Sequence, residues 1–256
     1  MIDALRRTGV RLAAVGVAAY LLFLVVNLPA AWLGYALERS SAGKIALGDP
    51  RGTVWKGQGS LAVRSGEGFR SVADIDWRCN PLALFAGRLS LRLSGGAPGA
   101  KLRADVSLGV RSVRLQSLEA SAPAALLESA VPAVAFFKPE GRVRVQADSF
   151  EVGAASVLGA ATVEWADAGL SGVARIGDYR LQITGTGERA AVKLATVRGD
   201  LRMSGDGEWR AAQPRLVQLR GVVDSSPERK DLEPLLQLLA GEGSGNSRQF
   251  GWMVTL

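Results

Sequence analysis

Few residues of this 256-residue chain have the types and spacing that chemistry requires. The chain has no histidine and a single cysteine, Cys79, which excludes imidazole-based catalysis, a disulfide framework and ordinary zinc sites. Asp74 and Asp76 share one side of an expected strand, and paired carboxylates can perform acid–base catalysis. Since no cleft pattern surrounds them, we interpret them as part of a solvated face. The sequence therefore predicts no catalytic residue, no metal site, no cofactor and no enzymatic activity.

Two other features could in principle be reactive or bind a ligand, but we interpret both as structural. Cys79 lies between Arg78 and Asn80, and a neighbouring cation can lower a thiol pKa, yet we favour a structural thiol. The glycine-rich stretches 185–187 and 205–207 are not part of a strand–loop–helix unit with phosphate-loop spacing. We interpret both stretches as turns.

The N-terminus predicts a membrane anchor. No charged residue occurs from Leu12 to Leu37, and the best apolar span, Leu12 to Leu28, approaches the length that a bilayer-crossing helix needs. Positive charge before the span favours a cytoplasmic N-terminus, and an aromatic residue just after it marks the membrane interface. We assign these anchor roles to Arg6, Arg7, Arg11 and Trp32. A cleaved signal peptide is the alternative, but the apolar run is too long for one and no clear cleavage motif follows.

This anchor divides the chain into three expected parts. Residues 1–11 form a cytoplasmic tail, residues 12–37 a transmembrane signal-anchor helix with its interface, and residues 38–256 a periplasmic β-rich domain. A lone cysteine suits the oxidising periplasm because it has no internal partner for a wrong disulfide. The net charge of +7 does not by itself indicate nucleic-acid binding, and the expected location argues against such a partner.

Beyond residue 50 the apolar pattern has a period of two, which is typical of strands with one packed and one wet face. The pattern occurs at 87–93, 102–108, 142–147, 179–183 and 201–204. Because strand follows strand at short spacing, we expect a mainly-β fold with a curved, largely antiparallel sheet. Tryptophans lie in or beside the strand-like runs, and we interpret most of them as core or sheet-edge anchors. They are Trp55, Trp77, Trp165, Trp209 and Trp252.

One or two short helices complete the predicted domain. The first is expected to start at Ser121 within the stretch 115–137 and to be limited by Pro132. The second starts at Ser226-Pro227 or Asp231 and ends before Gly241. Its apolar stripe is expected to pack against the sheet rather than to bind a partner, and it consists of Leu232, Leu235, Leu236 and Leu239.

Several short motifs resemble the type II secretion system protein N family, the N component of the general secretion pathway of Gram-negative bacteria. The most specific are the turn Gly52-Thr-Val-Trp-Lys-Gly57 and the later Trp77-Arg-Cys-Asn-Pro81. Shorter matching pieces lie at 27–32, 139–141, 158–165, 177–179 and 199–205. The residues that match the family motifs are Gly52, Thr53, Trp55, Gly57, Trp77 and Pro81, and a purely structural role would explain all of them.

The resemblance implies an accessory inner-membrane subunit that supports export of folded periplasmic proteins across the outer membrane through protein–protein contacts. Its partners would be other secretion subunits, namely inner-membrane platform, clamp-like or secretin components. Its location would be the bacterial inner membrane, crossed once, with the C-terminal domain in the periplasm. At the level of fold it distantly resembles AsmA-like proteins, whose sheets curl into an apolar groove. A periplasmic groove protein that binds or transfers lipid between membranes is therefore the alternative.

Overall fold

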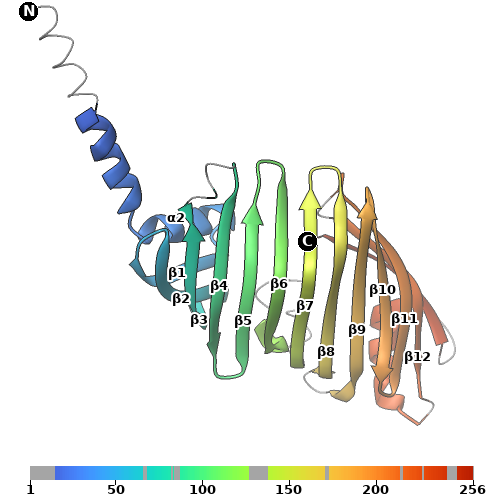
Figure 1. The fold of residues 1–256 in the computed structure, drawn as a ribbon. Coiled ribbons are helices and arrows are strands. Elements are labelled where there is room, and N and C mark those ends of the chain that lie inside the picture. Colours follow the sequence, from blue (N-terminus) through green and yellow to red (C-terminus); the bar gives the residue numbers. More distant parts are fainter. Residues whose placement is uncertain are drawn as a thin grey trace, which may run out of the picture.

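The computed structural model describes residues 15–65, 68–81, 83, 87–126, 138–170, 173–213, 216–226, 228–240 and 247–255. Within these ranges, thirteen strands form one sheet whose spatial order is the order of the chain (Figure 1). Every neighbouring pair is antiparallel, so the strands follow one another as a continuous meander. The sheet is open, with the first and last strands at its edges. The expected mainly-β, antiparallel fold is confirmed.

The strands and helices have the following bounds. The strands are β1 Ile45–Gly52, β2 Lys56–Ser65, β3 Gly68–Asn80, β4 Leu89–Ala97, β5 Ala100–Leu108, β6 Ser112–Pro123, β7 Pro139–Gly153, β8 Val157–Leu170, β9 Val173–Gly187, β10 Arg189–Arg198, β11 Leu201–Arg210, β12 Leu216–Ser225 and β13 Ser247–Thr255. The helices are α2 Ala31–Ser40 and α5 Glu233–Ala240, and the 3-10 turns are η2 Ala124–Leu126 and η3 Lys230–Leu232. Residues 15–26 are also helical.

The register gives the sheet one apolar and one polar face. Trp77 lies opposite Leu93, and Leu93 lies opposite Ala104, so apolar residues of successive strands share a face. The other face has ion pairs between strands that are adjacent in the sheet. These pairs are Arg92–Asp105 at 2.7 Å, Arg114–Glu151 at 2.6 Å, Arg180–Glu164 at 2.9 Å and Arg189–Glu208 at 3.3 Å. Alternation along each strand thus separates a packed face from a wet face, as the sequence predicts.

Helices cover the apolar face near both ends of the sheet. At the N-terminal end, Leu33 of α2 packs against a buried cluster that contains Ile75 and Trp77. At the C-terminal end, η3 and α5 bury Leu232 and Leu236 completely in the larger cluster. Each buried leucine contributes about 1.5–3 kcal/mol of transfer free energy. The predicted C-terminal helix and its role in core packing are therefore confirmed, whereas α2 was not anticipated as a separate helix.

The expected helix at 115–137 is wrong in its first part. Residues up to Pro123 belong to strand β6, and only η2 follows; residues 127–137 lie outside the described residues. Ser121, the expected helix start, pairs in the sheet with Lys101 of β5 and Arg144 of β7. Strand β6 also contains a β-bulge, where Ser117 adopts a φ of 49° and the pairing with β5 shifts. The bulge brings Leu115 and Leu118 to the same face although they are three residues apart, a spacing that is typical of a helix.

The two glycine-rich stretches are also not turns. Gly185 and Gly187 lie in β9, and Gly205 and Gly207 lie in β11. At Gly185, Gly205 and Gly207 the missing Cβ leaves room for neighbouring side chains. On Gly185, for example, a Cβ would be 2.7 Å from Cγ1 of Val157.

The N-terminal helical segment extends away from the sheet. Figure 1 shows residues 15–26 projecting beyond α2, and all twelve side chains are exposed. Among the residues that the structure describes, no helix has both the length and the apolar character to span a bilayer.

Candidate functional site: the joint at the N-terminal end of the sheet

The loop between β1 and β2 binds the chain that leaves the N-terminal helical segment. The amide of Ala30 donates to the carbonyl of Gly52 at 3.1 Å, and the amide of Val54 donates to the carbonyl of Leu28 at 2.9 Å. Pro29 and Thr53 form an isolated antiparallel bridge between these two hydrogen bonds. We call residues 25–30, residues 52–57 and Trp77 together the joint, since they connect the helical segment to the sheet.

Trp55 connects the helical segment to strand β3. Its indole Nε1 donates to the carbonyl of Val25 at 2.8 Å, across 30 residues of sequence. Val25 lies in the last turn of the helical segment, and its carbonyl also accepts a hydrogen bond from the amide of Leu28 at 3.3 Å. The carbonyl of Trp55 accepts a hydrogen bond from the amide of Cys79 in β3 at 2.7 Å. One residue therefore holds both the end of the helix and the third strand.

Trp77 fixes the loop from the apolar face. It is 2% exposed, and its Nε1 donates to the carbonyl of Thr53 at 3.1 Å. Its ring lies directly over Gly57: a Cβ at that position would be 2.5 Å from Cζ2 of the indole and closer still to the carbonyl oxygen of Arg51. Gly57 thus has no room for a side chain. The spacing of this glycine and this tryptophan follows from their contact across β2 and β3, where they pair in register.

Two further residues shape the loop: one has a short polar side chain, and the other is a glycine in the left-handed region of φ/ψ space. The hydroxyl of Thr53 accepts hydrogen bonds from the amides of Trp55 and Lys56, both at 3.3 Å, which closes the turn locally. Gly52 has a φ of +93°, a conformation that residues with a Cβ rarely adopt. Five of the six motif residues therefore meet in one structure: Gly52, Thr53, Trp55, Gly57 and Trp77.

The remaining sequence-predicted residues lie elsewhere. Pro81 directly follows β3 and is exposed. Trp32 is 58% exposed on α2 and makes an edge-on contact with Tyr35, with ring centres 6.5 Å apart. The predicted anchor arginines, Arg6, Arg7 and Arg11, lie outside the described residues. Sequence reasoning missed the partners of the joint, which are main-chain groups of Val25, Leu28 and Ala30.

The candidates for chemistry are not assembled into a reactive site. Cys79 is buried on the apolar face, and this burial raises the pKa of its thiol. Asp74 and Asp76 are exposed on the polar face, where the register places them opposite Gly96 and Ser94. In the described part of the chain, no three residues of the types His, Cys, Asp and Glu gather closely enough to hold a metal ion.

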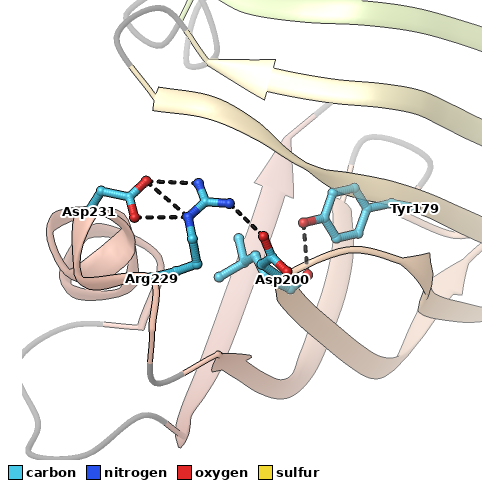
Figure 2. Close-up of polar contacts among 5 residues, drawn as sticks. Tyr179, Asp200, Arg229 and Asp231 are labelled. Carbon is cyan, nitrogen blue, oxygen red and sulfur yellow. Dashed lines mark hydrogen bonds and ion pairs between the residues drawn. The ribbon is translucent and has the colours of Figure 1, made fainter.

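A second set of contacts fastens the C-terminal helical region to the sheet. Figure 2 shows Arg229 between Asp231 of η3 and Asp200 before β11, with closest N–O distances of 2.8 Å and 2.5 Å. Hydrogen bonds from Arg229 lower the pKa of the Asp231 carboxyl. The hydroxyl of Tyr179 donates to the carbonyl of Leu201 at 2.9 Å, and burial raises the pKa of this tyrosine well above its usual range.

In both helical regions, an indole N–H donates to a carbonyl in the last turn of the helix. Trp252 of β13 donates from Nε1 to the carbonyl of Leu239 in the last turn of α5 at 2.9 Å. Trp55 does the same for Val25 at the other end of the sheet. The carbonyl of Val25 also accepts a hydrogen bond from the amide of Leu28. For these two tryptophans, which the sequence predicts as anchors, the structure identifies the hydrogen-bond acceptors: the carbonyls of Val25 and Leu239.

The comparison with known families covers most of the sheet. The family model described as type II secretion system (T2SS), protein N, matches residues 43–250, from just before β1 into β13. The searches of curated proteins and of solved structures found no match. Proteins N are accessory components of the secretion system. Because the match extends over most of the chain and includes the sheet-side residues of the joint, this chain belongs to the type II secretion system protein N family.

Proposed function

We propose that this chain is an inner-membrane accessory subunit of the type II secretion system that supports export of folded periplasmic proteins across the outer membrane through contacts with other subunits. The observation that carries the proposal is the family match over residues 43–250. The arrangement of the chain agrees with it, since an exposed apolar helix, a joint and a broad sheet are suited to positioning a surface rather than to catalysis.

The N-terminal helical segment supports membrane attachment. Its apolar side chains are exposed: Val15 is 66% exposed and Phe23 is 62% exposed. Exposing contiguous apolar surface to water is unfavourable, whereas a bilayer would bury it. We therefore keep residues 12–37 as the anchor with its interface, residues 1–11 as a cytoplasmic tail and residues 38–256 as the periplasmic domain. The joint would then hold the sheet at a set position beside the bilayer.

The sheet edges are suited to contacts with other subunits. The outer sides of β1 and β13 have no strand partner among the described residues. Unpaired backbone amide and carbonyl groups on an edge strand can accept an added strand from another protein. The inner-membrane platform, clamp-like components and the secretin are the proposed partner classes.

Deletion and complementation in the chain's own organism test the proposed function. Loss of the gene should reduce release of secreted enzymes into the medium and leave them in the periplasm. The wild-type chain should restore release, whereas a chain that starts after residue 40 behind a cleavable signal peptide should restore it less well. Unchanged release and unchanged subunit assembly in the deletion strain would contradict the proposal.

Lipid handling is the second candidate, and one observation favours it. Near the ends of the middle strands the apolar face remains partly open, since Leu108 is 37% exposed and Val113 is 41% exposed, whereas α2 and α5 cover the two ends of the sheet. An open apolar strip could shield an acyl chain. Mass spectrometry of the purified full chain tests this idea: reproducible co-purified lipid would support it, and repeated absence of lipid would contradict it.

A further inference from the structure

The polar face of the sheet has a hollow of about 670 Å³ over β5, β6 and β7. Its walls have two cations from β5, Lys101 and Arg103, and two from β7, Arg142 and Arg144. The register explains the hollow, because Lys101 lies opposite Ser121 and Ser121 lies opposite Arg144. A short side chain in the middle strand thus separates two long cationic ones.

The cations of this hollow differ from several others on the same face. Several arginines elsewhere on it have carboxylate partners in the next strand, such as Arg92 with Asp105 and Arg189 with Glu208. Within the described structure, Lys101, Arg103 and Arg142 have no ion pair.

The fourth cation is only weakly paired, since Arg144 is 3.8 Å from Glu164. Glu119 is the single carboxylate that lines the hollow. Glu119 lies opposite Arg103 in the register and offsets one of the four positive charges. The remaining excess of positive charge favours an anionic partner.

The spacing of the four cations matches an extended polypeptide. Lys101 and Arg103 are alternate residues of one strand, as are Arg142 and Arg144, so each pair is separated by about 6.6–6.8 Å along the strand. The two pairs lie on strands about 9–10 Å apart, with β6 between them. A peptide that runs along β6 and carries carboxylates at alternate positions has the same period and would place its charges between the two rows.

The position of the hollow argues against a membrane surface as its partner. Figure 1 shows the hairpin between β4 and β5, next to Lys101, at the lower edge of the sheet, while the helical segment leaves at the upper left. Lipid headgroups around that helix would therefore lie at the opposite end of the strands.

We propose that this hollow is a docking site for an acidic, extended segment of a partner protein, with carboxylates at alternate positions. The site is separate from the joint and from the sheet edges. Its binding is measured on the purified chain, and so it is tested independently of the secretion role.

Fluorescence anisotropy of the full chain in neutral-lipid nanodiscs tests the site. The probe is a short labelled peptide of alternating glutamate and serine, and the control peptide has the same composition with all glutamates in one block. At about 0.1 M salt, the double variant Arg103→Gln/Arg142→Gln should weaken binding of the alternating peptide about tenfold. The matched variant Arg92→Gln/Arg189→Gln removes the same charge from paired positions on this face and should change binding less than about twofold.

Three results would overturn the proposal. Equal losses in the two double variants would show that only net charge matters, and equal affinity for the two peptides would remove the argument from spacing. Binding to phosphatidylglycerol vesicles that depends on Arg103 and Arg142, without peptide binding, would assign the hollow to lipid headgroups instead. Thermal melts of both variants should coincide with the wild type, because all four side chains are exposed.

Discussion

Substituting Gly57 by alanine should damage the joint directly. A Cβ at this position would be 2.5 Å from the ring of Trp77 and would also press on the carbonyl oxygen of Arg51. Neither neighbour can yield easily, since the indole is 2% exposed and hydrogen-bonded to Thr53, and the carbonyl belongs to strand backbone. The structure therefore predicts overpacking rather than the mild gain that Gly→Ala often brings elsewhere.

The expected size of the effect follows from these contacts. Overpacking of a tight site costs about 1–3 kcal/mol, and two fixed neighbours place Gly57→Ala near 2 kcal/mol. For a domain of this size, such a loss lowers the Tm by about 4–8 °C. Gly251→Ala is the matched control: Gly251 is also a strand glycine, but its Cβ would meet nothing within 4 Å, so its Tm should change by less than about 2 °C.

Two assays on the full chain measure the damage. Thermal unfolding followed by tryptophan fluorescence gives the change in Tm. The rate at which a thiol reagent labels Cys79 reports on the joint itself, because the Cys79 amide bonds to Trp55 and its buried thiol has a raised pKa. Gly57→Ala should speed this labelling while Gly251→Ala should not. Indistinguishable melting and labelling of the two variants would refute the packing derived for the joint.

Three further predictions concern the helices and the acid response. Trp55→Phe removes the hydrogen bond to Val25 and should lower stability by about 0.5–1.5 kcal/mol, with faster hydrogen exchange at residues 25–30; unchanged exchange there would contradict the role of the indole. Leu236→Ala empties a fully buried position and should cost about 2–5 kcal/mol in thermal unfolding, whereas a cost below about 1 kcal/mol would show that α5 is not part of the core. The Asp231 carboxyl has a pKa below its ordinary value of 3.8, so its contribution to stability is present above that pH and is lost as the pH falls through the lowered pKa. Asp231→Asn should therefore flatten the decline in Tm at acidic pH, and a slope equal to that of the wild type would rule out this contribution.

The strands of the sheet were largely predictable from residue order because one face is packed and the other is wet. In β4, Leu89, Leu91 and Leu93 alternate with polar residues, and the same period recurs in β5, β7, β9 and β11. The pattern fails where the backbone departs from regular pleating. In β6 the bulge at Ser117 changes the spacing of Leu115 and Leu118 and imitates a helix.

The joint was predictable only as a set of residues. The motif singled out Trp55 and Trp77, but their hydrogen-bond acceptors are main-chain carbonyls of Val25 and Thr53. A main-chain acceptor leaves no trace in the type of side chain at its position, so no pattern could reveal these partners. The hollow on the polar face was equally hidden from the sequence, because it depends on the strand register that brings Lys101, Ser121 and Arg144 into one row.

Site-specific photo-crosslinking in the native organism tests the proposed secretion role most directly. A photoreactive residue replaces Gln249 on the edge strand β13 or, as a control, Gln182 on β9 inside the sheet; both side chains are exposed. Crosslinks from position 249 to platform, clamp-like or secretin subunits, and fewer from position 182, are predicted. Crosslinks to lipid alone from both positions, with no secretion subunit captured, would contradict a role through protein contacts at the sheet edge.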